Sequence, residues 1–221
     1  MNAPIARTVR HAALSILALG LLTACGQDAA PEPADAPATP AAADTATRAV
    51  DDDADLARAR AAAQAFSGQL RERLQGAMED GGPVAAVEVC HADAPRIAEA
   101  VMATHGVRLG RVALPGRNRN PAHVADDWRL QTLQAFQQAV EGGAPAADQV
   151  AVLRDDLPEG VALRMMRGIA TEPGCLACHG SDVAPAVAET IAARYPNDGA
   201  TGFDVGDLRG ALWVEVPEAA Q

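Results

Sequence analysis

Two cysteines and a histidine lie close together in the segment TEPGCLACHG, residues 171–180. Cys175 and Cys178 are separated by two residues, and His179 follows the second cysteine directly. This CxxCH spacing is the pattern of covalent c-type haem attachment. The two thiols can reach both vinyl groups of a haem from one side, and the adjoining imidazole can then bind the iron as an axial ligand. The pattern therefore predicts one covalently attached haem c.

Three other kinds of site also use a cysteine pair at this spacing. A thioredoxin-like redox pair opens a helix after a strand and needs no following histidine. Half of a zinc site needs two more ligands, commonly a second paired group. A disulfide across two intervening residues is strained and uncommon. Haem attachment explains the histidine as well, and the single CxxCH motif predicts a monohaem protein, not a multihaem wire or a dihaem peroxidase.

The start of the chain has the features of an export signal. Its first eleven residues carry two arginines, and they are followed by the short apolar run AALSILALGLL (12–22). This run is too short to cross a bilayer as a mature helix. LTAC (22–25) resembles a bacterial lipobox, in which the cysteine becomes the lipidated first residue. We therefore expect residues 1–24 to be a lipoprotein signal peptide and Cys25 to carry the lipid.

The residues after Cys25 predict a location and a tether. Several acyl chains would anchor the protein stably, because each buried methylene contributes about 0.8 kcal/mol. Gly26 stands where many inner-membrane lipoproteins have an aspartate, which favours an outer-membrane anchor facing the periplasm. Residues 25–50 are rich in Pro, Ala, Asp and Thr, and this composition predicts a disordered tether. Residues 51–221 then form one domain of ordinary size, the c-type haem domain.

The charge of the chain bears on its partners. The formal net charge is −11, all 18 basic residues are arginine, and no basic stripe is present. This distribution argues against nucleic-acid binding. The absence of lysine, like the abundance of alanine, is better explained by genomic composition than by function.

Cys90 is left over once the other three cysteines have been assigned to lipid and haem. A leftover cysteine in an oxidising compartment is either buried and inert or coordinated. Five other side chains could bind the haem iron opposite His179, and each has a simpler explanation. The two methionines suit the core of a strand, one histidine suits the end of a helix, and the others suit solvent. These five are His91, His105, His123, Met165 and Met166.

Hydrophobic periodicity predicts the elements that carry these residues. Apolar residues at helical spacing form one face over residues 56–77, and the glycine pair at 81–82 should end that helix. A second helix carries Cys90, is interrupted or restarted at Pro95 and ends at Gly106. Further helices are predicted over 128–140 and 183–196. Mostly short strands are predicted over 107–114 (with Gly110 at a bulge), 149–153, 161–166 and 209–216, which together indicate an α+β fold.

Several segments together resemble a known family, the Tll-like haem-domain family, over residues 55–216. They are AVEVCHADAPRIAEAV (86–101), GVRLGRVALPGRNRNP (106–121), DDWRLQTLQAF (126–136), CLACHG (175–180) and GDLRGAL (206–212). The resemblance implies a periplasmic monohaem domain in which a PAS-like antiparallel sheet is packed against N-terminal helices. It also implies axial ligation by the histidine of CxxCH and a cysteine from an N-terminal helix. By position, that cysteine is Cys90, which makes His179 and Cys90 the expected ligands of the iron.

These ligands predict the redox behaviour. A thiolate is a strong anionic donor that favours ferric over ferrous iron, so the haem should have a low potential. Arg111 and Arg117 are candidates for binding the haem propionates, because guanidinium groups match carboxylates. Each of them could equally be an ordinary surface arginine.

Three functions suit such a domain. An electron carrier needs a six-coordinate haem near the surface and a redox partner protein, which remains unidentified. A redox or diatomic-gas sensor would use a labile Cys90–iron bond, and a separate partner would have to carry the output because the chain ends at Gln221. An enzyme such as a peroxidase needs acid–base residues at an open iron face, and no convincing set is present. We expect an electron carrier, with the sensor as the alternative.

Overall fold

A computed structural model describes residues 40–219, with side chains from residue 54 onward. The predicted signal peptide, the lipidation site Cys25 and the first part of the predicted tether lie outside the described residues. None of the described helices combines the length and the apolar character needed to cross a membrane.

The first element is the long helix α1, Pro40–Glu88. It starts before Asp51, where the sequence predicted the helical pattern to begin, and so includes residues 40–50 of the predicted tether. This segment is alanine-rich and begins with a proline, a composition that suits a helix even without large apolar residues. The predicted break at the glycine pair is confirmed, because Gly82 has φ 68° and ψ −164° and separates two helical segments.

A turn of π-helix, Val89–Asp93, connects α1 to helix α2, Ala94–His105. Cys90 lies on this turn. Pro95 occupies the first turn of α2, a position at which proline is tolerated. The expected interruption therefore occurs just before the proline, as a wider turn and not as a break. Gly106 adopts the left-handed conformation that ends α2, as predicted.

Four antiparallel strands form one sheet in the order β1-β4-β3-β2. The α+β class is confirmed. β3 is ten residues long and exceeds the short strand expected over 161–166, whereas β4 extends the strand expected over 209–216 by one residue at each end. The strands are β1 (Arg108–Val112), β2 (Val150–Leu153), β3 (Val161–Ala170) and β4 (Leu208–Pro217).

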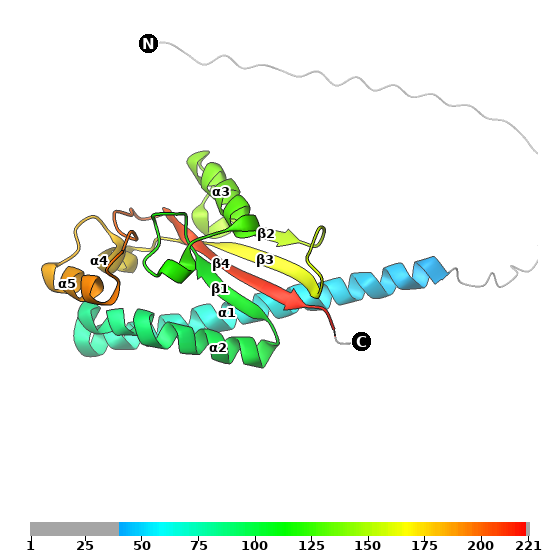
Figure 1. The fold of residues 1–221 in the computed structure, drawn as a ribbon, viewed down its shortest axis with the longest axis horizontal. Coiled ribbons are helices and arrows are strands. Elements are labelled where there is room, and N and C mark those ends of the chain that lie inside the picture. Colours follow the sequence, from blue (N-terminus) through cyan, green and yellow to red (C-terminus); the bar gives the residue numbers. More distant parts are fainter. Residues whose placement is uncertain (1–39, 220–221) are drawn as a thin grey trace, which may run out of the picture. The chain divides into compact units, whose positions relative to one another are not determined.

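Helices cover both faces of the sheet. Helices α1 and α2 lie on one face and α3, Asp127–Glu141, lies on the other (Figure 1). The two faces of β4 alternate as the pleat requires, with Leu212 and Val214 packed toward α1 and α2 and Trp213 toward α3. The sheet is therefore the central layer of the domain, with a hydrophobic cluster on each side.

The CxxCH motif lies in the long connection between β3 and β4. A 3₁₀ turn, Pro173–Cys175, leads into the short helix α4, Leu176–His179, and neither was expected from the sequence. Helix α5, Pro185–Arg194, follows inside the predicted range 183–196. Two further 3₁₀ turns lie at Pro121–His123 and Ala146–Asp148.

Gly110 does not lie at a bulge, because β1 pairs with β4 in an unbroken register. A Cβ atom at this position would lie 2.9 Å from the indole of Trp213, so glycine provides room for the ring. The register shifts of the sheet occur instead between Val161 and Leu163 and between Ile169 and Ala170.

The core makes a matched test with two methionines possible. Met166 is 0% exposed beneath α3, whereas Met78 on α1 is 39% exposed. We expect Met166→Ala to lower the free energy of unfolding by about 2–5 kcal/mol, because it leaves a cavity. Met78→Ala should change it by about 0.5 kcal/mol or less. Equal effects of the two substitutions in denaturant titrations would contradict this packing.

Candidate functional site

The turn that carries Cys175 is fastened to α1. The Glu172 N–H donates to Cys175 Sγ at 3.4 Å, and the Cys175 N–H donates to the backbone carbonyl of Glu172 at 2.9 Å. Arg71 of α1 donates to both carboxylate oxygens of Glu172, at 2.8 and 2.9 Å. This hydrogen bond lowers the pKa of Glu172 and raises that of Arg71. Both side chains are exposed, so the pair orients the turn more than it stabilises the fold.

His179 is held in one tautomer. Its Nδ1 lies 2.7 Å from the carbonyl oxygen of Ala200, which can only accept a hydrogen bond. The proton is therefore on Nδ1 and the lone pair on Nε2, which lies 3.3 Å from an Nη of Arg209. Burial lowers the pKa of His179 to about 2, assisted by Arg209 and Arg119. A neutral imidazole whose Nε2 carries the lone pair can bind a metal through Nε2, and in this structure that lone pair faces the Arg209 donor.

Three arginines gather around His179. Arg119 is paired with Asp198, with its Nε and Nη2 at 3.0 and 3.1 Å from the two carboxylate oxygens. Arg111 and Arg209 have no carboxylate partner within residues 54–219, and burial lowers the pKa of both. The Arg209 Nε is buried without a hydrogen-bond partner there. Such desolvated cations suit an anionic group.

Cys90 belongs to the same group of side chains. It is half-buried on the π-turn and close enough to influence several neighbours electrostatically. Burial lowers the pKa of Arg111, and the nearby Cys90 partly opposes this lowering. Burial raises the pKa of Cys178, and Cys90 raises it further. The structure thus brings together five of the expected site residues, namely Cys90, Arg111, Cys175, Cys178 and His179.

Arg117, the other arginine expected to bind a propionate, also lies beside the group. Its Nη1 donates to the carbonyl of Thr201 at 3.1 Å, and its guanidinium stands 4.0 Å from the centre of the Phe203 ring. Its contacts are therefore with the loop that precedes β4.

The alternative iron ligands have other surroundings. His91 is exposed and meets the Tyr195 ring edge-on, with the centroids 5.4 Å apart. Met165 and Met166 are buried on opposite faces of the sheet, in the two hydrophobic clusters. His105 lies in the last turn of α2, as predicted. Each of these residues has a structural role that explains its position.

His123 differs from the expectation of a solvated loop residue. It is half-buried, and burial lowers its pKa to about 4, with a further contribution from the positive charge of Arg111. His123 is the last residue of the 3₁₀ turn Pro121–His123. This turn contacts β1, and the contact explains why His123 is half-buried.

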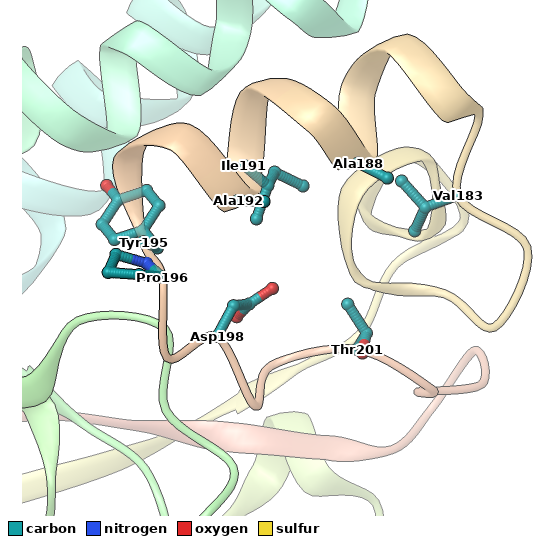
Figure 2. Close-up of a pocket in the computed structure, with 8 residues that line it drawn as sticks. All are labelled: Val183, Ala188, Ile191, Ala192, Tyr195, Pro196, Asp198 and Thr201. Carbon is teal, nitrogen blue, oxygen red and sulfur yellow. The ribbon is translucent and has the colours of Figure 1, made fainter.

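An apolar enclosure adjoins Cys178. The cysteine packs against a cluster formed by Val87, Val187, Ile191 and Tyr195. Next to it lies a cavity of about 200 Å³, with Ile191 and Ala192 of α5 on one side and Asp198 and Thr201 on the other (Figure 2). The group therefore combines an apolar wall with cations and one imidazole, a combination typical of cofactor sites.

Three important residues were not predicted from the sequence: Arg119, Asp198 and Arg209. Arg209 lies in the otherwise apolar start of β4, and this position was an available signal of burial. The pairing of Arg119 with Asp198 joins residues 79 positions apart, and no local pattern announces it.

Comparison with known proteins identifies the family. The Tll0287-like family model matches residues 42–217, which is most of the chain. The protein belongs to the Tll0287-like family. The resemblance seen in the sequence is thereby confirmed. One solved structure, of the cyanobacterial heme-protein Tll0287, is 32% identical with a TM-score of 0.46, and the match covers 60% of this chain and 74% of that one. No curated protein matches.

The environment of His123 predicts a pH dependence. Its folded pKa of about 4 lies below the ordinary value of 6.5, so the unfolded chain binds more protons between these values. The contribution of His123 to stability is complete above pH 6.5 and is lost as the pH falls toward 4. An NMR titration should show its midpoint near 4, and Arg111→Gln should raise it while leaving it below 6.5. An ordinary midpoint in the unsubstituted protein would contradict the burial, and Arg96→Gln on exposed α2 serves as the control.

Proposed function

We propose that this protein is an exported monohaem c-type cytochrome that transfers electrons at low potential, with His179 and Cys90 as the axial ligands. The observation that carries the proposal is the hydrogen bond from His179 Nδ1 to Ala200, which leaves the lone pair on Nε2 facing Arg209, whose own charged neighbours include Cys90 and Cys175. Family membership and 32% identity to a cyanobacterial heme-protein support the choice of cofactor.

The residues present fit a haem. Cys175 and Cys178 supply the two thiols of covalent attachment, and the apolar cluster beside Cys178 suits a macrocycle. Arg111 and Arg209 are cations without a carboxylate partner among the described residues, and the buried Nε of Arg209 lacks an acceptor there. Haem propionates would supply negative charge to both arginines and a hydrogen-bond acceptor to the Arg209 Nε. We therefore add Arg209 to Arg111 and Arg117 as a candidate propionate ligand.

A bound haem supplies a reversible one-electron couple, and the surrounding residues would set its reduction potential. The Ala200 carbonyl orients the imidazole of His179 and makes it a stronger donor. A Cys90 thiolate would add negative charge at the iron and favour the ferric state, which lowers the potential. Together these two ligands suit a carrier that donates electrons to a separate redox partner protein.

A sensor remains the second candidate, because Cys90 lies on a π-turn. Single π-turns interrupt regular helix hydrogen bonding and often occur at functional sites. Loss of the Cys90–iron bond, on reduction or gas binding, could therefore change the helix and signal to a partner. Rapid binding of CO or NO to the reduced protein would favour the sensor, whereas its absence would favour the carrier.

Substitution of Cys90 tests the proposal directly. We expect purified wild type to carry one covalent haem by mass spectrometry and to show a low-spin thiolate signal by EPR. Cys90→Ser should keep the haem, lose this signal and raise the potential within the roughly 0.8 V that axial ligands span. His91→Ala is the matched control and should change neither property. An unchanged Cys90→Ser spectrum would exclude Cys90 as a ligand, and absence of covalent haem from wild type would overturn the cytochrome assignment.

We also propose that lipid on Cys25 anchors the protein in the periplasm, with the outer membrane favoured. Cys25→Ser should remove the mass of the lipid and move the protein from the membrane to the soluble periplasmic fraction. The control Cys90→Ser should stay with the membrane, because its lipidation site is intact. Membrane association of Cys25→Ser equal to that of wild type would contradict lipid anchoring.

A further inference from the structure

The loop before the 3₁₀ turn at Pro121–His123 lies directly against the loop that follows α5. The Gly199 N–H donates to the carbonyl of Asn118 at 3.0 Å. A Cβ atom on Gly199 would lie only 2.2 Å from the carbonyl oxygen of Gly116, so the two backbones touch with no room for a side chain. The loop over residues 116–120 thus packs against residues 198–203 and can fix their position.

Arg119 makes most of the polar contacts between these loops. Its fork binds the carboxylate of Asp198, and its Nη2 donates to the carbonyl of Cys178 at 2.7 Å. The side chains of Arg119 and Asp198 are only 10% and 12% exposed. One guanidinium therefore holds the peptide unit that immediately precedes His179.

Asp198 extends this contact to the partner of the imidazole. Its Oδ1 accepts from the Ala200 N–H at 2.9 Å, and the Ala200 carbonyl faces His179 Nδ1. Arg119 Nη2 also lies 3.4 Å from that carbonyl oxygen. Arg119 is therefore connected to His179 from both sides, through the backbone before it and through the acceptor of its ring N–H.

Arg117 braces the same ring from a third direction. It binds the Thr201 carbonyl and covers the face of Phe203. Phe203 in turn meets His179 edge-on, with ring centroids 6.4 Å apart, and donates its N–H to the His179 carbonyl at 3.0 Å. The 116–120 loop thus constrains both the position and the plane of the imidazole.

We infer that Arg119 is a positioning residue that fixes the tautomer and orientation of His179 and thereby sets the potential at which His179 serves an iron. The effect on the potential rests on the proposed function, whereas the effect on the tautomer and orientation of His179 does not. Without Arg119 the Ala200 carbonyl is less firmly held and the Nδ1 hydrogen bond weakens. The imidazole is then a poorer donor, and the ferric state loses stabilisation.

The test removes the pair without changing the net charge. The double variant Arg119→Met/Asp198→Asn is compared with wild type, because loss of either charge alone would shift a potential by itself. Arg119→Lys keeps the charge but cannot form the fork, so it should behave like the double variant. Arg96→Lys, at an exposed arginine on α2 paired with Asp93, is the charge-matched control and should resemble wild type.

The first measurement uses the proteins as purified, with whatever haem they carry. ¹⁵N NMR of the histidines reports the tautomer of His179 and the exchange of its Nδ1 proton with water. We expect this exchange to be about tenfold faster or more in the double variant and in Arg119→Lys. The second measurement is the reduction potential of the haem-loaded proteins, which should shift upward in both variants.

The outcomes separate this inference from the proposed function. Unchanged Nδ1 exchange in both variants overturns the positioning role, even where the potential moves, since that shift would then be purely electrostatic. Faster exchange together with a higher potential supports it. If wild type attaches no haem, the proposed function fails while the NMR result still decides the role of Arg119. If the double variant does not fold, Arg119→Lys supplies the same two readouts.

Discussion

The hydrogen bond between His179 Nδ1 and the Ala200 carbonyl is the interaction on which the site depends. A half-buried histidine has three available protonation forms, and only the neutral form with its proton on Nδ1 can bind a metal through Nε2. This bond selects that form, and burial keeps the ring neutral. The acceptor lies on a loop without regular secondary structure, so its position must come from tertiary contacts. The 116–120 loop supplies them, and the sheet supports that loop through β1.

The electrostatics of the domain are local. The chain as a whole is strongly acidic, yet cations predominate around His179. A buried cation without an anionic partner typically costs several kcal/mol. Arg111 and Arg209 form no ion pair with a carboxylate among residues 54–219, so they are unfavourable for the fold unless an anion joins them. In the proposed cytochrome, haem propionates would offset this cost. Cofactor binding and folding stability would then be linked, because the same two arginines contribute to both.

The sequence predicted the regular elements well and the contacts between them less well. The α1 face, the glycine break and the ends of α2 follow from apolar spacing and glycine, which act locally. The start of α1 was missed because alanine favours helix without producing an apolar face. The motif and the family resemblance point to CxxCH and Cys90 as candidate site residues, and their role in binding haem stays a prediction. The Arg119–Asp198 pair could not be predicted, since it depends on how two loops 79 residues apart in the sequence come together.

The π-turn at Cys90 has a geometric consequence for the whole N-terminal layer. A π-turn accommodates one residue more than an α-helical turn, and each residue of an α-helix advances the rotation by roughly 100°. The insertion therefore sets the rotational phase of α2, and with it the direction in which Ala94 and Val101 face the hydrophobic cluster. Removal of one residue here would make the helix regular and turn its apolar side away from the sheet. The rotational phase of α2 is thus determined by the same π-turn that carries Cys90.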